Sequence, residues 1–307
     1  MNWETERFKI WAHTRSVMEN DNYKNKRNGV KSRRLWKIFA NMLIIFSYFL
    51  KVIKVYKKGY DNAMNVKINT IKLEFEDLPE EFENYKILHL SDLHIDTTKY
   101  LYKAIIKKID SIDYDICVMT GDYRVSEYGG FKSIIKPISK LIEHIKTKDG
   151  IYGTLGNHDT YLMVDFFEKQ GVNILANQHI DIHKGNSKIT ITGIDDVHCY
   201  FTDQAIVALE ENINNFKIML VHSPELYDIA ADNNYNLYLC GHTHAGQICF
   251  PNGKPLITHL YNGKKYYKGL WKYKNMHGYT SSGCGTSGIP IRFYSNSEIT
   301  IFELKRK

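Results

Sequence analysis

Residues 237–247, LYLCGHTHAGQ, join an apolar run to two histidines and give the first indication of the fold and its site. The run Leu237–Cys240 ends at Gly241, and His242 and His244 follow with a single threonine between them. Residues two apart on an extended segment share a face, so both imidazoles are expected on one side of the chain. A buried strand that ends in two histidines predicts part of a ligand set, whose other members should lie at other strand ends.

Four further apolar runs end in polar side chains in the same way. They are residues 87–90, 116–120, 152–155 and 218–221, and they are followed by SDLHID, GDYR, GNHD and HSPE. Near-continuous apolar runs of this length are typical of strands buried on both faces, whose carboxyl ends line the ligand crevice in α/β sheets. The side chains at these ends form one set of candidate metal ligands: Asp92, His94, Asp122, Asn157, His222, His242 and His244.

Helical patterns separate these runs. Apolar residues recur every three or four positions in residues 99–112, 131–145 and 205–213, as on one face of a helix. Residues 65–78 predict an opening strand, residues 179–193 a hairpin around Gly185 and Asn186, and residues 289–304 closing antiparallel strands. The fold class is therefore predicted as α/β (α+β), with two mixed β-sheets rather than one parallel sheet.

The residue types in the candidate set indicate which metals fit. Carboxylates and an amide mixed with imidazoles suit Mn²⁺, Fe²⁺ or Zn²⁺, and one carboxylate can bridge two ions about 3.5–4 Å apart. Glycines precede Asp122, Asn157 and His242 and allow the backbone to turn sharply there. The five cysteines are odd in number and form no CxxC pair, so buried, reduced thiols are expected rather than a disulfide framework.

The ordered set D-x-H, GD, GNHD, H and GHTH resembles the calcineurin-like metallophosphoesterase family over residues 65–307, and the tail after GHTH looks like its YkuE-like bacterial branch. The resemblance implies a four-layer αββα sandwich, the metallo-dependent phosphatase fold. It also implies two divalent ions and a metal-bridging hydroxide as nucleophile. The roles it implies are Asp92, His94 and His244 on the first ion, Asn157, His222 and His242 on the second, Asp122 bridging both, and His158 as proton donor to the leaving oxygen.

Some positions depart from the family or stay open. The chain reads GDYR and GNHD where family protein phosphatases carry GDxVDRG and an arginine within GNHE, so phosphoprotein substrates are not expected. Arg124 is a candidate catalytic residue that either grips a phosphate in bidentate fashion or pairs with an acidic side chain. His198 either reaches the site from a loop or is structural. Asp195 and Asp196 are expected to cap a loop or helix, and Arg292 to form a structural ion pair.

The N-terminal segment is strongly basic. Residues 1–60 contain 14 Lys or Arg and four acidic residues, a net charge of +10; since the whole chain carries +7, residues 61–307 carry −3. The uncharged stretch 38–50 is shorter than the ~20 residues needed to cross a bilayer. Residues 31–58 are therefore expected to form a helix on an anionic membrane surface, with a twin-arginine-like export signal at SRRLWK or a helix docked on the core as alternatives.

These patterns predict two parts: a segment at 1–59 and a catalytic domain at 60–307 that should fold without it. The expected function is hydrolysis of a phosphomonoester, phosphodiester or pyrophosphate, with a lipid-linked substrate such as UDP-2,3-diacylglucosamine, at the cytoplasmic face of a membrane. Alternatives are a nuclease, a cyclic-nucleotide phosphodiesterase and a non-catalytic metal-binding scaffold. A nucleic-acid partner is not expected, because residues 61–307 are acidic overall; the scaffold is disfavoured because every ligand position is filled. The oligomeric state stays open.

Overall fold

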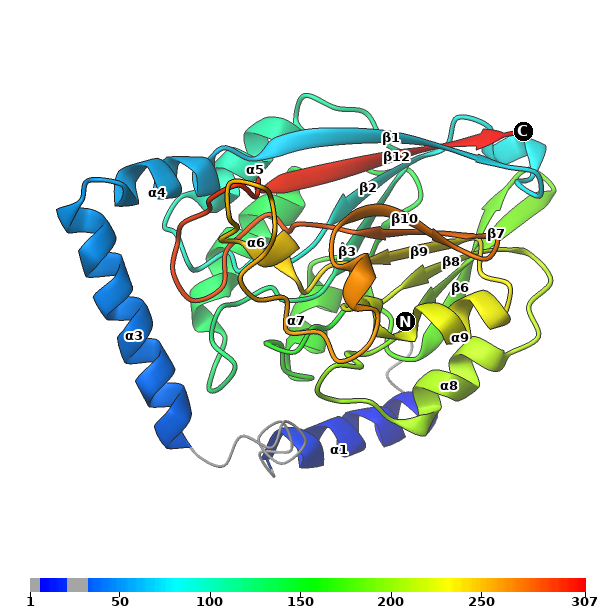
Figure 1. Ribbon diagram of the computed structural model, residues 1–307. Helices are drawn as coiled ribbons and strands as arrows, with labels where there is room; N and C mark the ends of the chain where they lie inside the picture. The colour runs from blue at the N-terminus through cyan, green and yellow to red at the C-terminus, as the bar shows by residue number, and fades with distance from the viewer. Residues whose placement is uncertain (1–5, 21–32) are drawn as a thin grey trace.

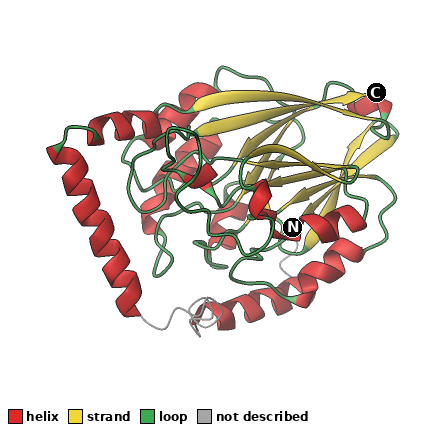
Figure 2. Ribbon diagram, viewed as in Figure 1, coloured by secondary structure: helices red, strands yellow, loops and turns green. Residues whose placement is uncertain are grey.

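The computed structural model describes residues 6–20 and 33–307, and its central feature is a pair of six-stranded sheets packed face to face (Figures 1 and 2). The first sheet has the order β1 (Lys67–Phe75), β12 (Glu298–Arg306), β2 (Lys86–Leu90), β3 (Ile116–Thr120), β4 (Ile151–Thr154), β5 (Val172–Ile174). The second has the order β10 (Gly269–Tyr273), β11 (Met276–Thr280), β9 (Leu237–Cys240), β8 (Phe216–Leu220), β7 (Ser187–Gly193), β6 (Gln178–Lys184).

Helices cover the outer face of each sheet. The first sheet packs against α5 (Leu101–Ile109), α6 (Lys132–Glu143) and α7 (Met163–Lys169), and the second against α8 (Asp203–Glu210) and α9 (Tyr227–Asp232). Alternation along each strand divides the core: in β2, Leu88 and Leu90 face the helices, whereas Ile87 faces the second sheet. The predicted four-layer αββα sandwich is therefore confirmed.

The five apolar runs that end in polar residues all form strands, as predicted. Strands β2, β3 and β4 are parallel neighbours in the first sheet, and β8 and β9 are parallel neighbours in the second. The hairpin is confirmed as well, because β6 and β7 pair antiparallel on either side of Gly185 and Asn186. Both sheets are mixed: β12 runs antiparallel to β2, and β10 runs antiparallel to β11.

The prediction for residues 289–304 is only half right. Residues 298–306 form β12, which is antiparallel to β2 but parallel to β1. The preceding residues make no strand, because their backbone groups bond elsewhere: Arg292 N–H donates to the carbonyl of Gly59, and Phe293 N–H donates to the carbonyl of Gln247. This stretch therefore ties the N-terminal helices to the loop that follows GHTH.

Within residues 6–20 and 33–64, the described part of the N-terminal segment contains the helices α1 (Glu6–Asn20), α3 (Arg33–Val52) and α4 (Tyr56–Met64). Helix α1 belongs to the body of the molecule, since Phe8 and Trp11 are buried in the core of the first sheet. Helix α3 runs along one side of the molecule in Figure 1, with Leu50 packed on Ile289 and Ile291. None of the helices in residues 6–20 and 33–307 has both the length and the hydrophobicity needed to span a membrane.

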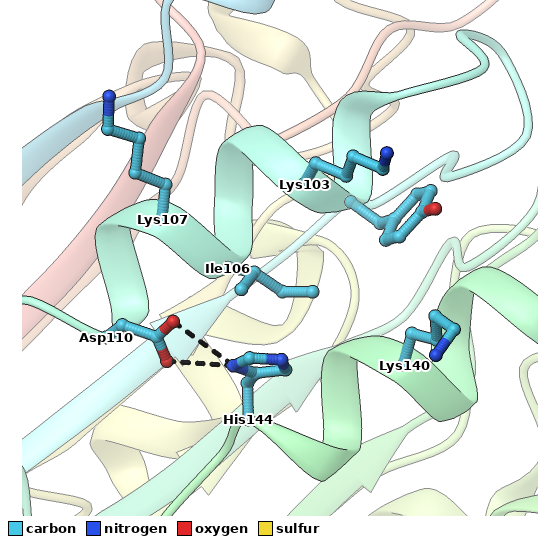
Figure 3. A pocket seen from close by; sticks show the side chains of 7 residues that line it. Lys103, Ile106, Lys107, Asp110, Lys140 and His144 are labelled. Carbon is cyan, nitrogen blue, oxygen red and sulfur yellow. Dashed lines mark hydrogen bonds and ion pairs between the residues drawn. The ribbon is translucent and has the colours of Figure 1, made fainter.

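A hollow of about 560 Å³ lies on the outside of α5 and α6 (Figure 3). Its rim carries Lys103, Lys107 and Lys140, and its floor holds a contact of 3.0 Å between His144 Nδ1 and Asp110 Oδ1. It contains none of the seven predicted metal ligands, so the chemistry that the sequence predicts lies elsewhere.

Candidate metal centre

Asp122 lies at the centre of the predicted ligand set. Its Oδ2 atom is 3.4 Å from His94 Nε2 and 3.3 Å from His222 Nε2, so one carboxylate oxygen faces imidazoles from both sheets. Its Oδ1 atom accepts a hydrogen bond of 2.8 Å from the backbone N–H of His158. The side chain is buried, and both of its oxygens are directed by fixed neighbours.

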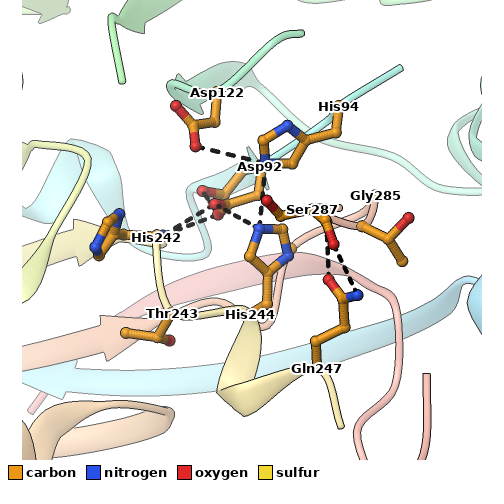
Figure 4. Close-up of polar contacts among 12 residues, drawn as sticks. Asp92, His94, Asp122, His242, Thr243, His244, Gln247, Gly285 and Ser287 are labelled. Carbon is orange, nitrogen blue, oxygen red and sulfur yellow. Dashed lines mark hydrogen bonds and ion pairs between the residues drawn. The ribbon is translucent and has the colours of Figure 1, made fainter. Parts of the chain in front are cut away.

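The first group of ligands gathers on one side of Asp122 (Figure 4). Asp92, His94 and His244 bring one ligand atom each to within 4.8 Å of one another. The Nε2 atoms of His94 and His244 are 3.2 Å apart, and His244 Nε2 is 3.5 Å from Asp92 Oδ1. The Nδ1 atom of His94 lies 2.8 Å from the carbonyl oxygen of Arg124, to which it can donate, and that contact leaves Nε2 free to bind an ion.

The second group lies on the other side of Asp122. Asn157 Oδ1 is 3.1 Å from His222 Nε2 and 3.0 Å from His242 Nδ1, and these two nitrogens are 3.3 Å apart. His222 Nδ1 lies 2.7 Å from the carbonyl oxygen of Thr120, which again leaves Nε2 directed into the cluster. The orientations of His94 and His222 both fit metal binding. The set of nitrogen and oxygen donors suits the divalent ions that the sequence predicts.

The close approach of the strand ends depends on glycine. A Cβ atom on Gly241 would lie 1.9 Å from Ser91 Oγ and 2.1 Å from Asp92 Oδ2, and one on Gly156 would lie 2.3 Å from Asp122 Oδ1. These distances are far below van der Waals contact, so no side chain fits at either position. The sequence predicts sharp turns at the glycines before His242 and Asn157, and the structure adds that these glycines let two loops meet at the carboxylates.

Burial and the attraction between neighbouring charged groups shift the pKa values of the clustered side chains. Burial alone would raise the pKa of Asp122, but the imidazoles of His222, His158 and His94 hold it well below its usual range. Burial lowers the pKa of His244 well below its ordinary value, and neighbouring His94 lowers it further. Asp122 is thus an anion, whereas burial tends to lower the pKa of the adjacent His222 but attraction to Asp122 raises it well above its ordinary value, so His222 would release a proton when a metal binds.

His158 lies at the edge of the cluster. Its Nδ1 is 2.7 Å from the carbonyl oxygen of Val125, while Nε2 is 3.8 Å from Asp122 Oδ2 and 3.9 Å from Glu127 Oε1. Its ring meets the ring of His94 edge to face, with centroids 4.9 Å apart. His158 is a site residue predicted from the sequence, whereas no role was predicted for Glu127.

The two arginines singled out in the sequence bond the backbone. Arg124 is buried and donates to the carbonyl oxygens of His158 and Gly129 at 2.7 and 2.6 Å, so these donors bind backbone rather than an acidic side chain. Arg292 donates to the carbonyl oxygens of Ser282 and Gly285 at 2.5 and 2.6 Å. The ion pair expected for Arg292 is therefore wrong, because carbonyl oxygens take up its Nη donors while Nε has no hydrogen-bond partner among the described residues, and Nη2 lies 3.3 Å from His244 Nδ1.

The loop after β7 supplies supporting residues that the sequence left open. The His198 ring lies 4.3 Å from that of His242, centroid to centroid, and its Nδ1 is 3.1 Å from Glu225 Oε2. Asp196 caps its loop as expected, accepting from Cys199 N–H at 2.7 Å. Asp195 instead pairs with Arg15 at 2.7 Å. No role was predicted for Glu225, because no local pattern in the sequence links residues 198 and 225.

Asp159, the last residue of GNHD, was also missed. Its carboxylate accepts hydrogen bonds from the backbone N–H groups of Asp122, Tyr123 and Gly156, at 2.7, 2.9 and 2.8 Å. It therefore locks the loop that carries Asn157 to the loop that carries Asp122. Its position next to two assigned residues was the only signal in the sequence.

Two facing mixed sheets with imidazoles and carboxylates gathered at their strand ends define a metallophosphoesterase. Residues 85–246 match the family model for calcineurin-like phosphoesterases, and this match covers more than half of the chain. The chain belongs to the calcineurin-like phosphoesterase family and is a phosphoric ester hydrolase that binds divalent metal.

Relatives agree with this assignment. YkuE of Bacillus subtilis, an uncharacterized metallophosphoesterase, is 32% identical over 242 residues, which cover 74% of this chain and 82% of YkuE. YkoQ of the same organism, also an uncharacterized metallophosphoesterase, is 29% identical over 265 residues, covering 80% of this chain and 93% of YkoQ. The phosphodiesterase YaeI of Escherichia coli is 25% identical over 236 residues, covering 72% of this chain and 82% of YaeI. The similarity to the Bacillus proteins places the chain in the predicted bacterial branch.

Proposed function

We propose that the chain is a dinuclear phosphoesterase in which Asp122 holds both ions. Asp92, His94 and His244 would complete one site, and Asn157, His222 and His242 the other. The observation that carries this proposal is the position of Asp122 Oδ2, 3.4 Å from one group and 3.3 Å from the other. Two divalent ions (Mn²⁺, Fe²⁺ or Zn²⁺) would offset the charge of a phosphate and lower the pKa of a water for in-line attack.

The role of His158 follows from its orientation. Because Nδ1 faces the carbonyl oxygen of Val125, Nε2 is left toward Asp122 and the open side of the cluster. From there His158 can donate a proton or a hydrogen bond to the leaving oxygen. Arg124 has no place in this scheme, because its donors bond the loop at 129–130 and the backbone of His158.

The substrate we propose is a phosphomonoester, phosphodiester or pyrophosphate that carries an apolar group, such as UDP-2,3-diacylglucosamine. Support comes from the loop at residues 250–261, whose side chains Phe250, Leu256, Ile257 and Tyr261 are exposed. This loop adjoins the cluster, since the carbonyl oxygen of His259 lies 3.5 Å from His242 Nε2. An acyl or other apolar group bound at the ions would cover part of this surface.

Membrane proximity is the second part of the proposal. Helix α3 exposes Ile44, Ile45, Tyr48, Phe49 and Lys51, and the chain that follows exposes Lys54, Lys57 and Lys58. An exposed apolar face beside cations fits a helix lying on an anionic bilayer at the cytoplasmic face. Export through a twin-arginine-like signal is the alternative, and it would place the enzyme on the other side.

A substrate panel tests the proposal. The protein, stripped of metal and reloaded with Mn²⁺, Zn²⁺ or Mg²⁺, is assayed on p-nitrophenyl phosphate, bis-p-nitrophenyl phosphate, a nucleoside diphosphate sugar and its diacylated form. We expect hydrolysis that depends on added metal and is fastest on the acylated compound. Faster cleavage of single-stranded DNA or of cyclic AMP would favour the nuclease or cyclic-nucleotide alternative, and two bound ions without hydrolysis of any ester would favour a scaffold.

A further inference from the structure

Helix α1 reaches the back of the metal centre through one buried arginine. We infer that Arg15 is a positioning residue, which fixes the loop carrying Asn157 and His158 by binding the carbonyl groups on either side of them. This inference rests on the proposed function in one respect, the role of Asn157 as a ligand. No local pattern in the sequence connects residue 15 with that loop.

The contacts of Arg15 are specific. The residue is only 1% exposed, and its Nη2 donates to the carbonyl oxygens of Gly156 and Asp159, both at 3.1 Å. Its Nη1 donates to Asp195 Oδ1 at 2.7 Å, and the guanidinium carbon lies 3.3 Å from the centroid of the Tyr200 ring. One planar group therefore joins the GNHD loop to the loop that carries His198.

The loop that Arg15 binds carries two of the predicted site residues. Asn157 and His158 are the two residues between the carbonyl groups that Arg15 holds. The N–H of His158 donates to Asp122 Oδ1, and the carboxylate of Asp159 accepts from the N–H of Asp122. A shift of this loop would therefore move a predicted ligand, the predicted proton donor and the predicted bridging carboxylate together.

A second residue of α1 holds the same loop one turn further along the helix. Glu19 Oε1 accepts from Tyr161 N–H at 3.0 Å, and Glu19 Oε2 accepts from Thr160 Oγ1 at 2.6 Å. Glu19 also pairs with Arg15 Nε at 3.0 Å, which orients the guanidinium. The loop is thus held at two points by one helix.

The chemistry of Arg15 argues against simple filling of space. Burying a guanidinium is costly unless its donors are satisfied, and an apolar side chain fills a gap at lower cost. Arginine is favoured where a planar fork must reach several acceptors at fixed angles, and lysine cannot replace it there. Changes to groups that orient metal ligands cost about 10–100-fold in metal affinity or activity.

The test compares two arginines of the same helix. Arg7 donates to Glu211 on the surface and does not contact the GNHD loop, so Arg7→Ala is the matched control for Arg15→Ala. Metal-free proteins are titrated with Mn²⁺ by calorimetry, and kcat and KM are measured on a soluble ester. Amide hydrogen exchange of residues 156–161 is measured in the metal-free state.

We expect Arg15→Ala to weaken the Mn²⁺ binding step that uses Asn157 by about 10–100-fold, and to weaken the other step less, since that site shares only Asp122 with the loop. The value of kcat should fall and recover at high Mn²⁺, and exchange at residues 156–161 should be faster. Arg15→Lys should be intermediate, because an ammonium group can reach Asp195 but not both carbonyls. Arg7→Ala should match the parent.

Parental Mn²⁺ affinity and parental exchange in Arg15→Ala, with only a lower melting temperature, would overturn the inference. If that variant does not fold, the same result in Arg15→Lys overturns it. A parent that binds fewer than two Mn²⁺ ions would instead contradict the dinuclear proposal. In that case the exchange at residues 156–161, which needs no metal, still decides the role of Arg15.

Discussion

Five of the seven predicted ligands have a left-handed backbone, a conformation that residues other than glycine rarely adopt. The φ angles are 47° at Asp92, 33° at His94, 58° at Asp122, 73° at His242 and 50° at His244. Such positions cost about 1–3 kcal/mol each and persist only where surrounding contacts impose them. Here the imposing contacts include the hydrogen bond from Asp92 N–H to the carbonyl of Gly121 and that from His94 N–H to the carbonyl of Asp122.

Asp122→Asn should weaken both metals together. The substitution keeps Oδ1 as an acceptor for His158 N–H but turns an amide NH₂ toward His94 and His222, in place of a carboxylate oxygen that faces both groups. We expect a loss of affinity larger than the ~10–100-fold that outer contacts cost, and no measurable turnover. Metal analysis after dialysis checks this result. Two fully occupied ions in the variant would disprove the bridging role.

His158→Ala should separate catalysis from metal binding. We expect full metal content and a turnover number lower by ~10²–10⁴, the range for a lost general acid. His144→Ala is the control, because His144 pairs with Asp110 in the hollow outside α5 and α6, which contains none of the predicted ligands, and should change neither quantity. Because His94, Asp122 and His158 also bring ligand atoms within 4.8 Å of one another, loss of metal in His158→Ala would make His158 a ligand.

At the scale of the elements, α3 exposes several apolar side chains close together, whereas helices such as α1 and α8 expose one or two. Leu43 and Leu50, seven residues apart, lie on the face toward residues 289–293, while Ile45 and Phe49 lie exposed. A helix of a soluble body normally buries such residues, so this surface requires a partner. The basic residues around it favour an anionic bilayer as that partner.

The full-length protein should bind vesicles of anionic lipid and be released by salt. Each Lys or Arg near the surface contributes ~1 kcal/mol, and in ~1 M salt screening shortens the reach of these charges to ~3 Å. Ile45→Asp should reduce binding at low salt, whereas Val207→Asp on α8, where the apolar side chain is 52% exposed against 68% at Ile45, should not. Cosedimentation measures both variants. Binding that resists salt and yields only to detergent would contradict a surface helix.

The alternative of export has its own test. Arg33→Lys combined with Arg34→Lys keeps the charge of the segment and removes only the arginine pair. Under our proposal, cell fractionation should find this variant where the parent is found. A parent outside the cytoplasm and a variant retained inside would show that the pair is an export signal.

At the scale of the whole molecule, the metal centre joins the two sheets. Asp92, Asp122 and Asn157 follow strands of the first sheet, and His222 and His242 follow strands of the second. Ions bound between them would therefore hold the layers together at this edge, and their removal would leave two buried carboxylates without cations.

Removing metal should lower the melting temperature by several degrees. A ligand present at 100 times its Kd stabilises the folded state by about 2.7 kcal/mol per site. Thermal unfolding of the parent in Mn²⁺ and in EDTA measures the difference, and Asp122→Asn should show a much smaller one. Equal melting temperatures of the parent in both conditions would mean that the cluster does not bind Mn²⁺ at these concentrations.

The domain boundary predicted between residues 59 and 60 also concerns the whole molecule. It falls inside α4, and α1 contributes Phe8 and Trp11 to the core of the first sheet. Removing residues 1–59 would expose that core surface and release the GNHD loop from Arg15 and Glu19. We therefore expect the shortened chain to lose stability, in contrast to the independence that the sequence suggested.

The sequence by itself determined the five strands and the candidate ligands at their ends, because each is a local signal. An apolar run followed at once by glycine and a polar residue specifies a strand, its end and its ligand within about ten residues, as at residues 237–247. The hairpin at residues 178–193 is local in the same way. The order of these signals was enough to predict the family, and the family match confirms it.

Only the tertiary structure decided which residues support the ligands. Arg15 contacts Gly156 across 141 positions and Asp195 across 180, and Arg292 lies 48 positions from His244. Residues 289–297 failed to form a strand because α4 and the loop after GHTH took their backbone hydrogen bonds. Such contacts join segments far apart in the chain. A buried donor can bind whichever acceptor the fold brings near it. Hydrophobic periodicity therefore carries no information about these contacts.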